Sequence, residues 1–145
     1  MARTRKSAKK SATAERVLVV EDDAILSLAY EEELRELGIK DIVVCATAEK
    51  ALEALREGRP DVMILDVHLA DRDDGWSLAD LVDNIGPNTP HIIFSTGAPQ
   101  DIPDRIKKLG DVLVKPVDMQ ELRKLVADTG TAKKGLMGRL RKSLA

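Results

Sequence analysis

Five short and almost wholly apolar runs alternate with segments of helical spacing, and this alternation limits the possible folds of the chain. The runs are residues 17–20, 42–45, 62–65, 92–94 and 112–114. Unbroken apolar character is typical of strands that are buried on both faces. Strands that alternate with helices imply right-handed crossovers and a parallel sheet covered on both faces. We therefore predict an α/β fold with a five-stranded parallel sheet.

Helices are predicted over residues 24–37, 48–57, from 76 on, about 104–109 and from 119 on, from their apolar spacing and from capping and stop residues. Thr47 and Asp118 are the expected caps, and Gly38, Gly58 and Gly86-Pro87 are the expected stops. The apolar faces are expected to contain Ile25, Leu28, Leu34 and Leu37; Ala51, Leu52 and Leu55; Trp76, Leu78, Ala79, Leu81 and Val82; and Leu122, Leu125 and Val126.

The composition is that of one globular domain. Of the 145 residues, 43% are hydrophobic and 33% charged, which is ordinary for a folded domain. The single cysteine, Cys45, excludes an intramolecular disulfide and fits a reducing compartment. No apolar stretch approaches the roughly 20 residues of a membrane span, and the N-terminus lacks the apolar core of a secretory signal. We therefore expect a cytoplasmic protein.

The net charge of −2 conceals an uneven distribution. Residues 1–14 and 129–145 each contain basic residues and no acid, so all 25 acids lie within residues 15–128. We predict a domain over 15–128 with two basic tails that can contact an anionic partner or surface. Leu136, Leu140 and Leu144 leave two options open for the second tail, an amphipathic helix or a disordered segment. We expect no sequence-specific nucleic-acid binding, because the body is acidic and contains no recognition module.

Polar residues follow four of the five predicted strands. They are Glu21-Asp22-Asp23, Asp66, Ser95-Thr96-Gly97 and Lys115-Pro116. The carboxyl ends of parallel strands meet at one edge of the sheet, which is where open α/β sheets bind ligands. Acids, a hydroxyl and a lysine at this edge suit Mg²⁺-assisted transfer of a phosphoryl group to an aspartate.

Residues 16–128 resemble the receiver domain of two-component response regulators. The resemblance is carried by Val-Val-Glu-Asp-Asp at 19–23, Leu-Asp at 65–66, Asp-Gly at 74–75, Ser-Thr-Gly at 95–97 and Val-Lys-Pro at 114–116. Each piece alone is a weak signal, whereas their order and spacing are specific. The resemblance implies the flavodoxin-like (βα)5 receiver fold. Residues 74–79 and 94–97 are also similar to a subgroup of stand-alone receivers with a Phe-Ala-Thr-Gly motif, several of which act in bacterial stress signalling.

The resemblance also implies a role for each matching residue. Asp66 would accept a phosphoryl group from the phosphohistidine of a sensor histidine kinase or a histidine phosphotransfer protein. Thr96 and Lys115 would each contact a phosphoryl oxygen, and the Lys115–Pro116 peptide bond would be cis. Mg²⁺ would be bound by Asp22, by Glu21 through water, by Asp66 and by the backbone carbonyl of His68.

Each of these residues also has a simpler interpretation. Asp22 or Asp23 can cap a helix, Thr96 can form a turn, and Lys115 can be an ordinary surface lysine. His91 is expected to be structural, and Cys45 is expected to be a buried apolar residue. Only the combination of residues favours the receiver site over these simpler roles.

The chain also departs from the family pattern. Val112 stands where receivers usually have an aromatic switch residue, three positions before the lysine. The loop after Asp66 is one residue longer than usual and places Asp71, Asp73 and Asp74 near the site. Only 17 residues follow Asp128, so we expect output through a partner protein or a phosphorelay.

Three functions fit these observations. The first is a single-domain response regulator that turns over only its own phosphoryl group and is not an enzyme on a separate substrate. The second is a receiver-like module that binds a protein regardless of phosphorylation, an alternative favoured by Val112. The third is a Mg²⁺-dependent phosphohydrolase with an aspartate nucleophile. It is disfavoured because His68 stands where that class has a second acid.

Overall fold

A five-stranded parallel sheet forms the centre of the protein. The computed structural model describes residues 14–69, 76–84 and 89–129, and the strand order is β2-β1-β3-β4-β5. The strands are β1 (Arg16–Val20), β2 (Asp41–Cys45), β3 (Val62–Asp66), β4 (His91–Thr96) and β5 (Gly110–Val114). All four neighbouring pairs are parallel, as the alternation of strands and helices predicts.

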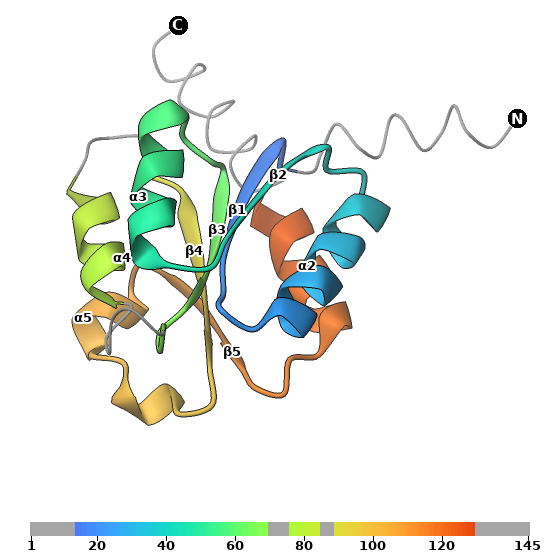
Figure 1. The fold of residues 1–145 in the computed structure, drawn as a ribbon. Helices are drawn as coiled ribbons and strands as arrows, with labels where there is room; N and C mark the ends of the chain where they lie inside the picture. Colours follow the sequence, from blue (N-terminus) through green and yellow to red (C-terminus); the bar gives the residue numbers. More distant parts are fainter. Residues whose placement is uncertain (1–13, 70–75, 85–88, 130–145) are drawn as a thin grey trace, which may run out of the picture.

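Helices cover both faces of this sheet (Figure 1). One face carries α3 (Ala48–Glu57), α4 (Trp76–Asp83) and α5 (Asp104–Lys107), and the other carries α2 (Ala24–Glu36) and a final helix over residues 119–129. A short 3₁₀ turn, η1 (Pro99–Asp101), precedes α5. The predicted α/β fold with helices on both faces is therefore confirmed.

The strands separate two apolar cores. In β1, Leu18 and Val20 belong to the cluster under α3, α4 and α5, whereas Val17 and Val19 belong to the cluster under α2 and the final helix. Successive side chains of a strand point to opposite faces, so a strand covered on both sides has no polar face. This two-sided burial explains the unbroken apolar runs of the sequence.

Among the described residues, the predicted caps Thr47 and Asp118 and the predicted stops Gly38 and Gly58 lie where helices begin and end. Thr47 accepts a hydrogen bond from the N–H of Lys50 at 3.1 Å, and Asp118 accepts one from the N–H of Gln120 at 2.9 Å. Asp23 is the cap of α2 and accepts from two backbone N–H groups. Gly38 has a φ of 95°, a left-handed conformation that suits glycine after a helix.

The predicted apolar face of α2 is right for Leu34, which is buried, and for Leu37, which packs against the same core, and it is wrong for Ile25 and Leu28. Ile25 and Leu28 are 83% and 57% exposed, and the buried residues of this helix are Ser27, Tyr30 and Leu34. The helix is rotated so that two hydroxyl groups, from Ser27 and Tyr30, reach hydrogen-bond partners at the strand ends. Leu81 of α4 is also exposed, at 47%, while Leu78, Ala79 and Val82 are buried as predicted.

Some predictions lie outside the described residues. They concern the two tails, the stop at residues 86–87, the acidic loop at 71–74 and the packing of the Trp76 side chain. The short fourth helix ends at Lys107, two residues before the predicted end, and the strands β4 and β5 extend beyond the predicted runs.

Candidate functional site

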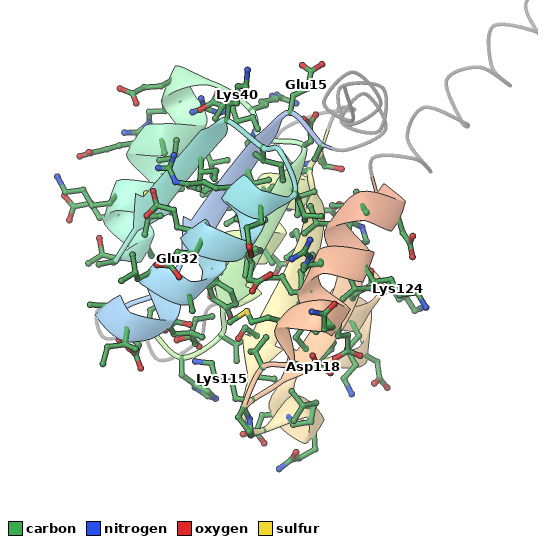
Figure 2. The ribbon with its side chains drawn as sticks, turned by 90° about the vertical axis from the view of Figure 1, so that its right-hand side faces the viewer. Glu15, Glu32, Lys40, Lys115, Asp118 and Lys124 are labelled. Atoms are coloured by element: carbon green, nitrogen blue, oxygen red, sulfur yellow. The ribbon has the colours of Figure 1, made fainter. Side chains whose placement is uncertain are left out.

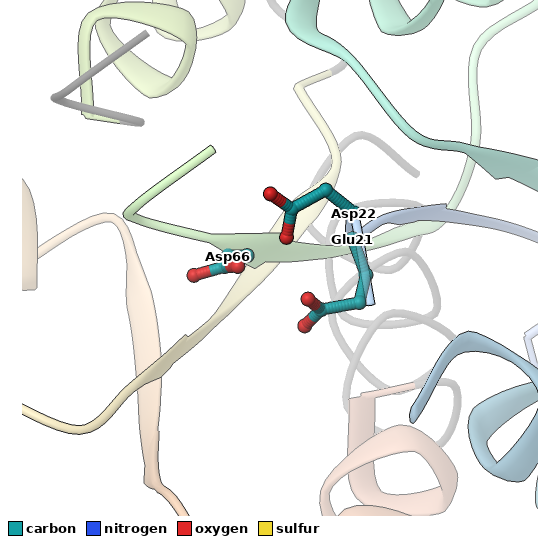
Figure 3. Close-up of side chains that lie close together, drawn as sticks. All are labelled: Glu21, Asp22 and Asp66. Atoms are coloured by element: carbon teal, nitrogen blue, oxygen red, sulfur yellow. The ribbon is translucent and has the colours of Figure 1, made fainter. Parts of the chain in front are cut away.

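Three carboxylates meet at the carboxyl edge of the sheet. Glu21 and Asp22 follow β1, Asp66 ends β3, and these two strands are neighbours with Val20 paired to Leu65. One oxygen from each carboxylate lies within 4.8 Å of the other two. Figure 3 shows the three side chains lying close together. The structure thus confirms the prediction that these three residues lie close together at this edge of the sheet.

Glu21 is buried, at 2% exposure, and Asp66 is buried too, whereas Asp22 is exposed. Oε2 of Glu21 accepts a hydrogen bond from the N–H of Asp23 at 3.1 Å, while its Oε1 has no hydrogen-bond partner among the described residues. Burial raises the pKa of Glu21 to about 7, and the charge of Asp66 adds to the rise. Lys115 and the hydrogen bond from Asp23 lower the pKa in part.

Lys115 brings the positive charge to this edge. Its Nζ lies 3.3 Å from Oε1 of Glu21 and 3.4 Å from Oδ2 of Asp66. Burial lowers the pKa of Lys115, but the charges of Asp66 and Glu21 outweigh burial, so the net shift is upward. The lysine therefore stays protonated. The Lys115–Pro116 peptide bond is cis, as predicted. Figure 2 labels Lys115 in the lower part of the molecule.

Asp66 and Thr96 are almost fully buried, at 4% and 1% exposure. Oδ1 of Asp66 accepts a hydrogen bond from the N–H of His68 at 3.0 Å, and Oγ1 of Thr96 accepts one from the N–H of Ala98 at 3.0 Å. Thr96 therefore makes the turn contact of its simpler interpretation, and Asp66 makes a contact of the same kind. Those contacts do not prevent a second role, because a carboxylate and a hydroxyl have further sites for hydrogen bonds.

Two further hydrogen bonds near the site were not predicted from the sequence. The hydroxyl of Tyr30 lies 2.8 Å from Oγ of Ser95, and Oγ of Ser27 donates to the carbonyl of Glu21 at 3.2 Å. The available signal was the helical spacing of Ser27, Tyr30 and Leu34, which places two hydroxyl groups on one face of α2. The residues Ile25 and Leu28 have the same helical spacing and are more apolar, so they obscured this signal.

The carboxylates fit a divalent cation. Glu21 and Asp66 share the Lys115 ammonium, so these two buried carboxylates carry one negative charge in excess when both are ionised. Oε1 of Glu21 is a buried oxygen that accepts no hydrogen bond among the described residues, although the Lys115 ammonium lies 3.3 Å away as an ion-pair partner. Hard cations such as Mg²⁺ prefer oxygen ligands of this kind. The residues present therefore suit a Mg²⁺ site.

This constellation is that of a receiver, and comparison with known proteins agrees. The response regulator receiver domain family matches residues 17–127. The chain belongs to this family. It is 32% identical over 111 residues to an uncharacterized response regulatory protein of Yersinia pestis, covering 75% of this chain and 45% of that protein. The chain spans about half the length of the curated relatives it matches.

Solved structures are similar in fold. A Francisella response regulator receiver domain is 27% identical, with a TM-score of 0.70, and the match covers 82% of this chain and 98% of that one. The receiver domain of PhyR from Erythrobacter litoralis is 25% identical, with a TM-score of 0.68 and coverages of 81% and 90%. The flavodoxin-like receiver fold is thereby confirmed.

Receiver domains are signalling modules of two-component systems, and this chain is one of them. Among the helices that the structure describes, none combines the length and the apolar character needed to span a membrane.

Proposed function

We propose that the chain is a response regulator that accepts a phosphoryl group onto Asp66 in a Mg²⁺-dependent reaction. The donor is the phosphohistidine of a sensor histidine kinase or a histidine phosphotransfer protein. The observation that carries the proposal is the position of Asp66. Its Oδ2 lies 3.4 Å from the Lys115 ammonium, and one of its oxygens lies within 4.8 Å of both Glu21 and Asp22.

The reaction assigns one role to each of these groups. An oxygen of Asp66 attacks the phosphorus, the P–N bond to the donor histidine breaks, and the imidazole leaves with the electron pair. The Lys115 ammonium pairs with one phosphoryl oxygen, and the Thr96 hydroxyl donates to another. A bound Mg²⁺ supplies further charge neutralisation for the phosphoryl oxygens. Asp22, Glu21 through water, Asp66 and the carbonyl of His68 would hold it.

The product is an acyl phosphate on the protein itself. Its hydrolysis restores Asp66, so the turnover is self-directed and the chain is not an enzyme on a separate substrate. We propose that output passes by contact with a partner protein or by a phosphorelay. The chain has a single cysteine, Cys45, which is a buried free thiol, and this sparing use of cysteine supports a cytoplasmic location.

The proposed organisation is a receiver over residues 15–128 with basic extensions at 1–14 and 129–145. The charge division of the sequence supports it, since all 25 acids lie between the extensions. The extensions would contact an anionic partner or surface. The Phe94-Ser95-Thr96-Gly97 stretch supports a place in the Phe-Ala-Thr-Gly subgroup.

Intact-protein mass spectrometry with Mg²⁺ and acetyl phosphate tests the proposal. We expect one phosphoryl adduct that requires Mg²⁺ and that is absent from the Asp66→Asn variant. Persistence of the adduct in this variant would place the modification elsewhere and overturn the proposal. A folded, Mg²⁺-binding protein without any adduct in several donors would overturn it too.

Val112 favours a second candidate, a receiver-like module that binds its partner regardless of phosphorylation. This residue is half-buried and packs against the core under α3, α4 and α5, in place of the aromatic residue that usually reports phosphorylation. Equal affinity of the phosphorylated and unphosphorylated chains for one partner would support this candidate.

A further inference from the structure

The Ser95–Thr96 dipeptide at the end of β4 connects the two segments that carry the central charges of the site. The carbonyl of Ser95 accepts a hydrogen bond from the N–H of Val67, the residue after Asp66, at 3.3 Å. The carbonyl of Thr96 accepts one from the N–H of Lys115 at 2.8 Å. The dipeptide therefore links the backbone next to Asp66 to the backbone of Lys115.

The side chain of Ser95 is fixed by Tyr30. Both residues are fully buried, and their hydroxyl oxygens are 2.8 Å apart. Successive side chains of a strand alternate between faces, so Ser95 points toward α2 while Thr96 points away from it. The hydrogen bond thus connects the Ser95–Thr96 dipeptide to α2. This helix lies on the opposite face of the sheet from the Thr96 hydroxyl.

The same face of α2 also binds the acidic segment Glu21-Asp22-Asp23 that follows β1. Ser27, one helical turn before Tyr30, donates from its Oγ to the carbonyl of Glu21 at 3.2 Å. Asp23 caps the helix through the N–H groups of Ile25 and Leu26. Because a helix is rigid over one turn, Ser27 and Tyr30 set the spacing between Glu21 and the end of β4.

We propose that Tyr30 is a positioning residue for the phosphoryl chemistry. Through its hydrogen bond to Ser95, it holds the end of β4 at a fixed distance from Glu21 and Asp22, and so aligns Asp66, Thr96 and Lys115. Tyr30 does not touch the phosphoryl group. The inference rests on the proposed function, which names the reaction that Tyr30 would assist.

The Tyr30→Phe variant isolates this role. It removes one oxygen atom, keeps the ring that fills the core beside Leu34, and leaves the hydroxyl of Ser95 without its partner. The Ser95→Ala variant removes the other half of the same hydrogen bond. Neither change removes a group that contacts the metal or the phosphoryl group.

The experiment measures the rate of adduct formation with acetyl phosphate and Mg²⁺, and the Mg²⁺ affinity by calorimetry, in the full chain. We expect each single variant to form the adduct about tenfold more slowly, as small misplacements of reacting groups do. We expect the Mg²⁺ affinity to stay within about twofold, since its ligands are unchanged. The Tyr30→Phe/Ser95→Ala double variant should be no slower than the slower single variant, because one hydrogen bond is lost in all three.

Val126→Ala is the matched control for stability. Val126 is fully buried in the same apolar cluster, in the final helix, and belongs to no part of the proposed site. All variants are compared at a temperature at which circular dichroism shows each of them folded. The control should form the adduct at the rate of the unmodified chain.

Three results would overturn the inference. They are an unchanged rate in Tyr30→Phe, a slowing as large in Val126→Ala, and rate losses that multiply in the double variant. Failure of the proposed function is distinguishable from all three, because the unmodified chain would then form no Asp66-dependent adduct at all.

Discussion

The Lys115 ammonium lies 3.4 Å from Oδ2 of Asp66, although their strands are not neighbours in the sheet. The strand between them, β4, carries the Thr96 carbonyl that binds the N–H of Lys115 at 2.8 Å. The same ammonium lies 3.3 Å from Oε1 of Glu21. One cation therefore balances two buried acids, and this arrangement leaves negative charge at the site when both acids are ionised.

Replacing Lys115 with methionine should slow phosphorylation without weakening Mg²⁺ binding. The phosphoryl oxygens lose a charge-assisted contact, which is worth about tenfold or more in rate. The metal loses a competing cation, so its affinity should be equal or higher. The measurements are the rate of adduct formation and calorimetry with Mg²⁺.

The exposed Lys124 of the final helix, labelled in Figure 2, provides the matched control. Lys124→Met makes the same chemical change away from the site and should leave both quantities unaltered. Equal rates for Lys115→Met and the unmodified chain would contradict the role assigned to Lys115.

The Asp22→Asn variant should bind Mg²⁺ at least about tenfold more weakly, because a charged ligand is replaced by a neutral one. Asp22 is exposed and lies in the loop between β1 and α2, so the loss of its charge should leave the fold intact. Calorimetry with Mg²⁺ measures the effect. Asp128→Asn, an exposed acid in the final helix, should bind Mg²⁺ like the unmodified chain. An equal loss in both variants would mean that net charge, not ligation, sets the affinity.

Much of the fold could be predicted because its signals are local. Each strand is an apolar run, and caps such as Thr47 act over three residues. The orientation of α2 could not be predicted in this way. Ile25 and Leu28 have the same spacing as Ser27 and Tyr30, so periodicity favoured the more apolar pair. The choice depends on partners at the ends of two distant strands, Glu21 and Ser95.

The candidate site followed from topology, because residues that end parallel strands must share an edge. Glu21, Asp22 and Asp66 gather there as predicted. The raised pKa of Glu21 could not be predicted from the sequence, since it depends on burial and on the distance to Asp66. The hydrogen bond between Tyr30 and Ser95 also depends on three-dimensional packing, because 65 positions separate the two residues.

The orientation of α2 predicts a sharp contrast in stability within one helix. Ile25→Ser and Leu28→Ser should change the free energy of unfolding by less than about 0.5 kcal/mol, as exposed substitutions do. Leu34→Ala should cost about 2–5 kcal/mol, because Leu34 is fully buried. Urea denaturation measures all three variants. A large loss of unfolding free energy in Ile25→Ser would mean that Ile25 is buried in solution.

The phenol of Tyr30 should make stability fall at alkaline pH. Burial raises the pKa of Tyr30 from 10.0 to about 12, the hydrogen bond to Ser95 lowers it in part, and the charges of Glu21 and Asp66 raise it. The folded state thus holds the phenolic proton more tightly than the unfolded state. This contribution is complete well below the unfolded pKa of 10.0, begins to fall as the pH approaches that value, and is lost as the pH rises toward 12. The loss should be on the order of 2 kcal/mol over the interval.

Tyr30→Phe isolates this contribution, because lysines and other groups titrate in both proteins and cancel in the comparison. The difference in free energy of unfolding between the two proteins should be constant below about pH 9 and should shrink above it as the phenol of the unfolded chain ionises. Urea denaturation at a series of pH values between about 8 and about 11.5 measures this difference. A difference that stays constant over the whole range would contradict the buried, neutral phenol, and with it the hydrogen bond that Tyr30 makes to Ser95.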